Sequence, residues 1–403
     1  MRYFPAMAHD QRQAAQMRWL GAAQLVEVVR SEPGITRAAA AQRLGIGSGG
    51  ATELLARMRQ ALLLDETPAP AQGRGRPTTV LGPHASGPLV LAADLRATDW
   101  RLALAGIDGV PKVVTQAEYA TEQLEPVLGQ LADAIGRIYR RNAKRLSAIA
   151  VAVAGTVSDA KLVQFTSRGW NDVDLSVLAA KIPNRAGVPL LLGNDATLAG
   201  LAEARSGAAR SASTALYLIV AQGIGGALIV NGEPLNGAHG AAGEYGHIPF
   251  GDPALLCPCG SRGCWDLTVD GRALARHRGD APPEDPVAYV HELISRGGRD
   301  GTSRRAFDAV AASLGRGIGG LVNLHDPEVV TLGGIAALLR ANSTKAFDDA
   351  YRQGLMAFRK EAPPPVRDAE HGEDGPLHGA VALALDHITA AAGLADWVER
   401  QRV

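Results

Sequence analysis

The chain has 403 residues, which is more than one ordinary domain holds and predicts two or three domains. Its 46% hydrophobic and 20% charged residues are typical of a globular protein and exclude a disordered chain. Lys plus Arg and Asp plus Glu both number 41, so the net charge of zero predicts no general affinity for nucleic acid or acidic membranes.

The net charge is not evenly distributed along the chain. Residues 1–80 contain ten Arg, no Lys and six acidic residues, which gives them a net charge of +4. The three Cys exclude a disulfide-stapled secreted scaffold, and the charged residues within 1–16 exclude the apolar segment of a signal peptide. No apolar run approaches the roughly 18 residues of a membrane helix. We therefore expect a cytoplasmic protein without a membrane partner.

The first 65 residues predict helices only. Thr36 and Ser48 can each cap a helix, and the Gly-containing segment 45–47 makes a tight turn between the two. Two short helices joined in this way are typical of a helix-turn-helix. The Pro-, Gly- and Thr-rich segment 65–79 then resembles the wing of a winged helix, followed by a linker. The predicted helices cover residues 17–29, 37–44 and 49–62.

From residue 89 onward the pattern alternates between strands and helices. This alternation predicts a layered α/β architecture, and more than 300 residues of it predict two lobes. Asn231-Gly232 between two apolar segments predicts a β-hairpin. The strands are predicted over 88–93, 100–105, 148–153, 188–192, 215–220 and 329–332, and the main helices over 124–142, 196–206 and 307–323.

The strongest chemical signal combines His247 with Cys257, Cys259 and Cys264, because all three Cys lie within eight residues. Three thiolates and one imidazole match the tetrahedral ligand set of structural zinc. Four protein ligands leave no position for a reactive water, so we expect one structural Zn²⁺ per chain. The alternative interpretation is three reduced thiols beside a surface histidine.

Glu244-x-x-His247 followed by Cys-x-Cys-Gly-x-x-Gly-Cys resembles the signature of the ROK family, which contains sugar kinases and sugar-responsive repressors. The resemblance covers nearly the whole chain and implies a two-lobed, ribonuclease-H-like or actin-like fold behind a winged helix-turn-helix. Other segments follow in the family's order, namely Ala150-Val151-Ala152-Val153-Ala154-Gly155, Asn194-Asp195-Ala196, Gly223-Ile224-Gly225-Gly226, Gly237-x-x-Gly240-x-x-Gly243 and Thr331-Leu332-Gly333-Gly334.

This architecture predicts three parts. Residues 1–80 would form the winged helix-turn-helix domain with its wing and linker, and residues 81–200 the first α/β lobe. Residues 201–376 would form the second lobe, which carries the zinc site and the dimer surface. The C-terminal helix, over about 377–395, would return to complete the first lobe.

Asn194 and Asp195 follow an apolar strand and open a helix, at the strand end where open α/β sheets bind ligands. Their amide and carboxylate suit the vicinal hydroxyls of a sugar, and a helix cap is the alternative interpretation. The resemblance implies that both bind a sugar together with Glu244 and His247, and that Asp195 is the general base in family kinases. Asp266 stands where the family commonly has a Glu, and as a candidate sugar contact its shorter side chain reaches less far.

The turns that would hold a nucleotide are altered. Family kinases open the first lobe with an Asp-x-Gly-Gly-Thr-like turn, whose glycines admit a phosphate close to the backbone. Here that turn reads Asp94-Leu95-Arg96-Ala97-Thr98-Asp99, without either glycine. The second turn reads Ala221-Gln222-Gly223 where the kinases usually have Gly-Thr-Gly. Both changes predict the loss of ATP binding, so we expect no enzyme activity.

Candidate DNA contacts lie on the reader helix, which a helix-turn-helix places in the major groove, and in the wing. The start of the reader helix is small and almost uncharged, and an Arg pair in the wing suits a narrow A·T-rich minor groove. A solvated basic linker is the alternative interpretation of that pair. The predicted contacts are Arg37, Ser48, Gly49, Thr52, Arg57, Arg74 and Arg76.

The sequence therefore predicts a sugar-responsive, DNA-binding transcriptional regulator, which we expect to be a repressor and to bind its effector without phosphorylating it. Its expected partners are operator DNA, a sugar or sugar derivative, and a second copy in a homodimer or dimer of dimers. Two alternatives stay open, a ROK sugar kinase with a DNA-binding head and a regulator whose lobes bind a partner protein.

Overall fold

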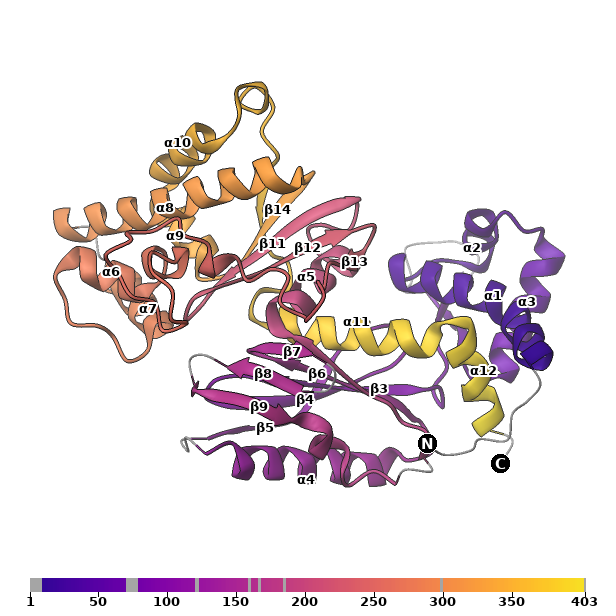
Figure 1. Cartoon of the computed structure of the whole chain (residues 1–403). Helices are drawn as coiled ribbons and strands as arrows, with labels where there is room; N and C mark the ends of the chain where they lie inside the picture. The colour runs from indigo at the N-terminus through magenta and orange to yellow at the C-terminus, as the bar shows by residue number, and fades with distance from the viewer. Residues whose placement is uncertain are drawn as a thin grey trace. The chain divides into compact units, whose positions relative to one another are not determined.

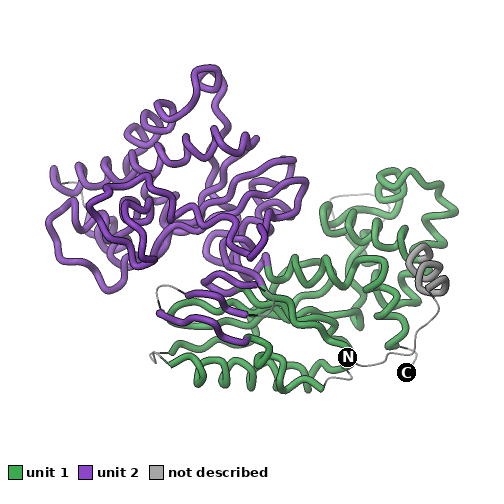
Figure 2. The backbone as a smooth tube through the Cα atoms, viewed as in Figure 1, with its two compact units in different colours: residues 1–152, 175–192, 380–403 green, residues 153–174, 193–379 purple. Residues whose placement is uncertain are grey.

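A computed structural model describes residues 9–69, 79–119, 123–158, 161–165, 168–183, 186–297 and 300–401. The chain divides into two compact units (Figure 2). Unit 1 comprises Met1–Ala152, Leu175–Leu192 and Ala380–Val403, and unit 2 comprises Val153–Asp174 and Gly193–Gly379.

Unit 1 begins with three helices and a two-stranded antiparallel sheet (Figure 1), which we call the head. Thr36 caps α2 by accepting a hydrogen bond from the backbone N–H of Ala39 at 3.2 Å, as the sequence predicts. The predicted cap at Ser48 is wrong, because the extended backbone of Gly47 starts the helix one residue earlier and Ser48 lies in its first turn. The elements are α1 (His9–Ser31), α2 (Arg37–Leu44), α3 (Ser48–Gln60), β1 (Leu64–Pro68) and β2 (Thr79–Pro83).

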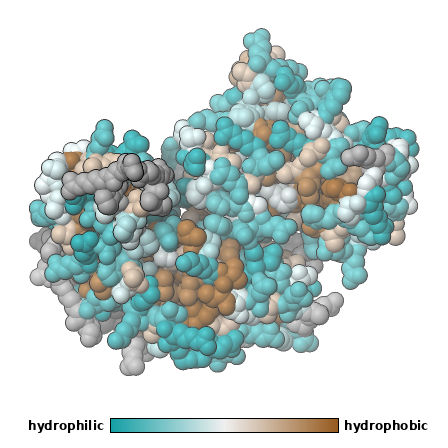
Figure 3. All heavy atoms as spheres, turned by 180° about the vertical axis from the view of Figure 1, so that it is seen from behind, coloured by the Kyte–Doolittle hydropathy of each residue, from teal (hydrophilic) through white to brown (hydrophobic). Residues whose placement is uncertain are grey.

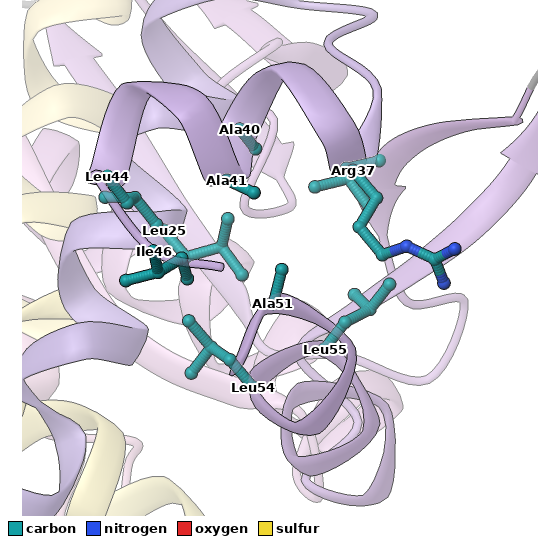
Figure 4. A pocket seen from close by; sticks show the side chains of 10 residues that line it. Leu25, Arg37, Ala40, Ala41, Leu44, Ile46, Ala51, Leu54 and Leu55 are labelled. Atoms are coloured by element: carbon teal, nitrogen blue, oxygen red, sulfur yellow. The ribbon is translucent and has the colours of Figure 1, made fainter. Parts of the chain in front are cut away.

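The helices of the head enclose a small apolar pocket (Figure 4). Leu25, Ala41 and Leu55 line it from α1, α2 and α3. The C-terminal helix α12 (Ala391–Arg400) adds the buried Trp397 to the same core, where its indole N–H donates to the carbonyl of Ala61 at 2.8 Å. The head is therefore held together by residues from both ends of the described chain.

The larger sheet of unit 1 has five strands in the order β10-β6-β3-β4-β5. The strands are β3 (Leu89–Leu95), β4 (Asp99–Ala105), β5 (Lys112–Glu118), β6 (Leu146–Val153) and β10 (Leu190–Asn194). Strand β6 is buried along its whole length, as expected for a continuous apolar run in a covered sheet. Helix α4 (Leu124–Asn142) matches the sequence prediction. The prediction of one C-terminal helix over about 377–395 is wrong, because α11 (Gly375–Thr389) ends at Thr389 and α12 begins at Ala391 after a bend of 76°.

Unit 2 contains a second five-stranded sheet in the order β13-β12-β11-β14-β15. When the strands of each sheet are numbered in chain order, both sheets have the same order, with the first strand (β3 or β11) in the centre between the second and the fourth. Its strands are β11 (Thr214–Val220), β12 (Ile224–Val230), β13 (Glu233–Pro234), β14 (Val329–Gly334) and β15 (Val366–Asp368). The predicted hairpin lies between β12 and β13, where Asn231 and Gly232 both have positive φ, +52° and +78°.

Five helices of unit 2 pack with this sheet around a core that contains Trp265, Leu314 and Phe347. They are α6 (Gly271–Arg278), α7 (Pro286–Ser295), α8 (Gly301–His325), α9 (Ala336–Asn342) and α10 (Thr344–Gly354), whereas α5 (Asp195–Ser206) packs on β11, β12 and β13. A separate three-stranded sheet of β7 (Thr156–Ser158), β8 (Lys161–Phe165) and β9 (Trp170–Asp174) was not predicted. The two sheets with their helices confirm the predicted α/β architecture.

No single helix in the described ranges is both long and apolar enough to cross a membrane. The helices Gly372–Thr389 and Ala391–Arg400 reach that length only as a pair, and they are bent by 76° at the break between them.

Candidate effector site and metal centre

The four predicted metal ligands lie together in unit 2. The ligand atoms of His247, Cys257, Cys259 and Cys264 are all within 4.8 Å of one another. The sulfurs of Cys259 and Cys264 are 3.6 Å apart, and His247 Nδ1 is 3.8 Å from the sulfur of Cys257. A tetrahedral zinc with sulfur ligands at about 2.3 Å separates those sulfurs by about 3.8 Å. The donor set therefore fits a metal ion of this kind.

The cysteine segment is built from tight turns. The N–H of Cys257 donates to the carbonyl of Ser261 at 2.8 Å, and the N–H of Gly260 donates back to the carbonyl of Cys257 at 2.9 Å. Gly260 and Gly263 have φ values of +94° and +69°, which an L side chain rarely adopts. These turns bring the three sulfurs to one side of the loop.

The other ring nitrogen of His247 faces a carboxylate. Its Nε2 is 3.9 Å from Glu244 Oε2, while Glu244 Oε1 accepts a 2.6 Å hydrogen bond from the hydroxyl of Thr156. The side chain of Glu244 remains 42% exposed, so ligands can reach it. In metal sites the second ring nitrogen of a metal-binding histidine typically faces a carboxylate, which fixes the orientation of the imidazole ring. The contact from Thr156, which follows the turn after β6, was not predicted.

Asn194 and Asp195 lie at the junction of β10 and α5, as predicted. Asn194 Oδ1 accepts from the N–H of Thr197 at 3.0 Å and so caps the helix, while its Nδ2 donates to the carbonyl of Gly155 at 3.1 Å. Asp195 Oδ1 accepts from the N–H of Ala196 at 2.8 Å. Asn194 therefore has the helix-cap role that was predicted as its alternative. Its amide also donates to Asp195 Oδ1 at 3.0 Å and so orients the Asp195 carboxylate.

Asp266 lies against a glycine-rich turn. Its Oδ1 accepts from the N–H of Ile224 at 2.5 Å, and its Oδ2 is 3.8 Å from His247 Nδ1. A Cβ on Gly246 would lie 2.0 Å from Asp266 Oδ1, so any other residue here would have to displace that carboxylate. Burial raises the pKa of the Asp266 carboxyl above its usual value. The contact of Asp266 with an effector stays a prediction, since one of its oxygens already has a partner in the protein.

The predicted effector residues thus form one connected set. Asn194 touches the carbonyl of Gly155, the next residue Thr156 touches Glu244, and Glu244 and Asp266 flank His247. The set offers amide, hydroxyl and carboxylate groups side by side, which is the chemistry that binds vicinal hydroxyls. A metal ion bound by His247 would join this set to the cysteine loop.

The turn between β3 and β4, in unit 1, is closed by ion pairs. Asp94 is completely buried and accepts a 2.9 Å hydrogen bond from the guanidinium of Arg101. Arg96 lies 3.6 Å from the same carboxylate and makes a 2.6 Å ion pair with Asp99. Burial raises the pKa of Asp94, and the two guanidinium groups oppose that rise. The hydroxyl of Tyr119 donates a hydrogen bond to the carbonyl of Arg96 and so ties the turn to the end of the β5 segment.

The turn between β11 and β12, in unit 2, also uses its polar groups internally. The N–H of Ala221 donates to the carbonyl of Gly223 at 3.0 Å, and the N–H of Ile224 donates to Asp266. Arg272 donates to the carbonyl of Gln222 and makes a 2.5 Å ion pair with Asp270. Because the two sheets share one strand order, this turn and the β3–β4 turn occupy equivalent places in their sheets.

The predicted DNA-contacting residues lie on the head as follows. Ser48, Gly49 and Thr52 are exposed in the first turns of α3. Arg57 lies further along that helix, 3.5 Å from Glu53, and Arg37 lies 3.7 Å from Glu66 with its guanidinium turned away from the apolar pocket (Figure 4). Arg74 and Arg76 lie outside the described residues.

Comparison with known proteins decides the family. Residues 90–387 match the sequence pattern of the ROK family. The chain belongs to the ROK family. It is 31% identical over 272 residues to the kanosamine kinase of Amycolatopsis mediterranei (strain S699), a match that covers 66% of this chain and 86% of the kinase. It is 24% identical over 249 residues to the xylose repressor of Bacillus subtilis (strain 168), over 60% of this chain and 62% of the repressor.

Two solved ROK structures share this fold. A ROK family transcriptional regulator, described as a homolog of the E. coli MLC protein, superposes with a TM-score of 0.74 at 20% identity, over 95% of this chain and 99% of the regulator. A ROK glucokinase from Streptomyces griseus, in complex with glucose and AMPPNP, superposes with a TM-score of 0.60 at 24% identity, over 73% of this chain and 98% of the glucokinase. The ROK fold therefore serves regulators and sugar kinases alike.

Proposed function

We propose that this ROK protein is a transcriptional regulator that binds DNA through its head and senses a sugar or sugar derivative without phosphorylating it. One observation carries the proposal. The β3–β4 turn, where family kinases have glycines that admit a phosphate, is closed by the ion pairs of Arg96 with Asp99 and of Arg101 with Asp94. The residues that we predict to bind sugar hydroxyls, by contrast, are all present in the sequence, namely Asn194, Asp195, Glu244 and His247.

A nucleotide phosphate would meet opposing charge at the closed turn. Each guanidinium group there already pairs with a carboxylate, so a phosphate would share those donors with Asp94 or Asp99 and would lie close to a negative charge. A phosphate that displaced the buried Asp94 would leave an uncompensated buried charge, which is strongly destabilising. Binding energy from oriented donors cannot be supplied from a distance, so closure of this turn favours sensing over phosphoryl transfer.

The proposed effector contacts are Asn194, Asp195, Glu244 and His247, with Asp266 as a neighbour that orients the glycine-rich turn. The proposed metal is one Zn²⁺ per chain on His247, Cys257, Cys259 and Cys264. When bound, the ion would supply a structural cross-link rather than a reactive water, because four protein donors complete its shell. His247 would then present its Nε2–H toward the Glu244 carboxylate, 3.9 Å away.

The head supports the DNA-binding part of the proposal. Helices α2 and α3 with the β1–β2 hairpin have the order of a winged helix-turn-helix, and α3 exposes small residues at its start. The superposition on the ROK regulator extends over 95% of the chain, which includes this head, whereas the glucokinase covers 73%. Small residues at the reader position let the helix approach the base edges closely, and Arg57 would then contact the backbone or a base.

The test is a thermal-shift screen of purified protein against sugars and amino sugars, followed by a DNA-binding titration with and without each sugar that binds. We expect one sugar class to stabilise the protein and to change its affinity for DNA from its own promoter region. Asp195→Asn should remove both effects, and Asp172→Asn, an exposed carboxylate on β9, is the matched control. A sugar that binds tightly and leaves the DNA affinity unchanged would refute the proposal.

A sugar kinase is the second candidate, because the chain is 31% identical to a kanosamine kinase. It predicts ATP-dependent phosphorylation of the sugar found in the screen, with Asp195 as the general base. Turnover measured with ATP and that sugar, and abolished in Asp195→Asn, would favour the kinase. We expect no turnover above the background of that variant.

A further inference from the structure

Helix α11 belongs to both units of the chain. Its first residues, up to Gly379, lie in unit 2, and the rest of the helix, from Ala380, lies in unit 1. Most of its residues are buried, and a closely packed interior transmits a displacement instead of absorbing it. Most of the face drawn in Figure 3 is polar, as expected of a protein that packs its apolar helices inside. A displacement at one end of α11 should therefore reach its other end.

The start of α11 lies directly on α5, within unit 2. A Cβ on Gly379 would overlap the carbonyl oxygen of Leu198, and a Cβ on Gly375 would lie 3.1 Å from that of Ala199. The two helices therefore meet backbone to backbone at Gly379, where no side chain can change its rotamer to absorb a shift of α5. Leu198 follows Asp195, a proposed effector contact, by about one turn of α5. A shift at the start of α5 would thus pass to α11.

The corner between α11 and α12 is also closely packed. The N–H of Ala390 donates to the carbonyl of Asp386 at 3.3 Å across the corner. A Cβ on Gly393, near the start of α12, would lie 2.5 Å from the carbonyl oxygen of His387 and 2.6 Å from that of Ile388. The start of α12 therefore rests on the last carbonyl groups of α11. These contacts fix the 76° bend between the two helices, so that α12 moves when α11 moves.

Helix α12 is anchored in the head, beside the helices of the predicted helix-turn-helix (Figure 1). The indole N–H of Trp397 donates at 2.8 Å to the carbonyl of Ala61, the residue that ends the predicted reader helix α3. Leu394 of the same helix is buried in the apolar core of the head. Nearer the corner, Asp386 of α11 accepts a 2.8 Å hydrogen bond from Arg30 of α1. The head is therefore attached to both helices.

The passage of the chain through α11 differs from its passage through the strands. The chain also passes between the units at the end of β6 and within β10, and both strands belong to the large sheet of unit 1. The passage through α11 continues instead to α12 and the core of the head. Coupling between distant sites is carried by rigid elements and packed contacts of this kind. The route from α5 to the head therefore runs through α11 and α12, which we call the connector.

We propose that the connector carries a displacement of α5 to the head and so changes the position of the reader helix α3. The inference rests on the proposed function, because Asp195 at the start of α5 is a proposed effector contact and α3 is the proposed reader helix. An effector that binds one position of α5 more tightly than another would in this way change the affinity for DNA. The connector itself is present without a ligand, so it can be tested without one.

The experiment is native-state hydrogen exchange of the full-length protein, purified in the presence of zinc, without DNA or sugar. Gly379→Ala adds a Cβ that overlaps the carbonyl of Leu198 and forces α11 away from α5. We expect the amides of α12 and of the end of α3 to exchange about tenfold faster in this variant, although the substitution lies in unit 2. Gly315→Ala is the matched control, because its Cβ would overlap the carbonyl of Phe347 where α8 meets α10 in the same unit. The control should leave exchange in the head within about twofold of the wild type.

A second change tests the corner of the connector. Two glycines inserted between Thr389 and Ala390 make the corner flexible, and in that background Gly379→Ala should no longer change exchange in the head. Melting curves show whether Gly379→Ala is folded. If it is not, Gly375→Ala replaces it, because a Cβ at 3.1 Å from that of Ala199 requires only a small shift of α11.

Three results would overturn the proposal. The first is an equal change in the head for Gly379→Ala and Gly315→Ala, because the head would then respond to any loss of stability in unit 2. The others are an unchanged head in a folded Gly379→Ala protein and an effect that persists beside the inserted glycines. DNA and sugar binding are measured separately on the same samples. A head that responds to Gly379→Ala in a protein that binds no DNA would refute the proposed function and leave the connector standing.

Discussion

Removal of Arg101 tests the closure of the β3–β4 turn. Arg101→Met deletes the guanidinium that donates at 2.9 Å to Asp94, which is completely buried. Breaking a buried ion pair by removal of one partner costs about 3–5 kcal/mol, because the other charge is left uncompensated. Arg96 remains 3.6 Å from the same carboxylate, so we expect the lower end of that range, about 3 kcal/mol at pH 8.

The stability that Arg101→Met loses should increase with pH. Burial raises the folded-state pKa of Asp94 above its unfolded value, so this carboxyl stabilises the fold most at low pH, where it is protonated in both states. Its contribution decreases as the pH rises through the folded-state pKa. The hydrogen bond from Arg101 opposes the rise in pKa, and its removal moves the pKa of Asp94 further up. The deficit of Arg101→Met should therefore be small near pH 5 and large at pH 8.

Native-state hydrogen exchange of the β3 and β4 amides measures the local loss of stability in Arg101→Met. It does not require that the two units unfold together. A loss of about 3 kcal/mol corresponds to roughly 100-fold faster exchange after correction for intrinsic rates. Asp94→Leu/Arg101→Met, which replaces the pair by apolar residues, should exchange within about tenfold of the wild type. An equal change at both pH values, or a double variant as unstable as the single one, would show that Asp94 and Arg101 do not form a coupled buried pair.

Three further predictions concern the effector site and the metal centre. Cys257→Ser should lower the zinc content well below one ion per chain by elemental analysis, and a zinc content equal to that of the wild type would rule out this thiolate as a ligand. Thr156→Val removes the 2.6 Å hydrogen bond to Glu244 and should weaken effector binding about tenfold by calorimetry, while Thr302→Val on α8 should not change it. Gly246→Ala would place a Cβ 2.0 Å from Asp266 and should cost about 1–3 kcal/mol in a denaturation titration, whereas Gly129→Ala, with open space around it, should be nearly neutral.

The sequence predicted the elements that have strong periodicity. Helix α4 was predicted over its observed residues, because its apolar positions repeat at helical spacing on one face. The β7–β9 sheet was missed, because its strands are three to five residues long and largely exposed, as in the Trp170–Asp174 strand. Short polar strands carry no periodic signal, so only their pairing in the folded chain defines them.

Residue types and spacing also predicted the cluster of ligands but not its partners. The His247 and cysteine positions follow from chemistry that is local in sequence. The hydrogen bond of Thr156 to Glu244 joins residues 88 positions apart, and the contact of Asp266 with Ile224 joins residues 42 apart. Such contacts depend on how sheets and loops pack, which the sequence pattern alone does not specify.

The repeated strand order of the two sheets has a consequence for any attempt to engineer a nucleotide site. Each sheet carries its own version of the same turn, and each version is held shut by different side chains, Arg96 and Arg101 in one and Arg272 in the other. Under the proposed function, glycines restored in one turn would leave the other turn engaged with its own side chains. Substitutions in a single turn should therefore not be enough to create a nucleotide site.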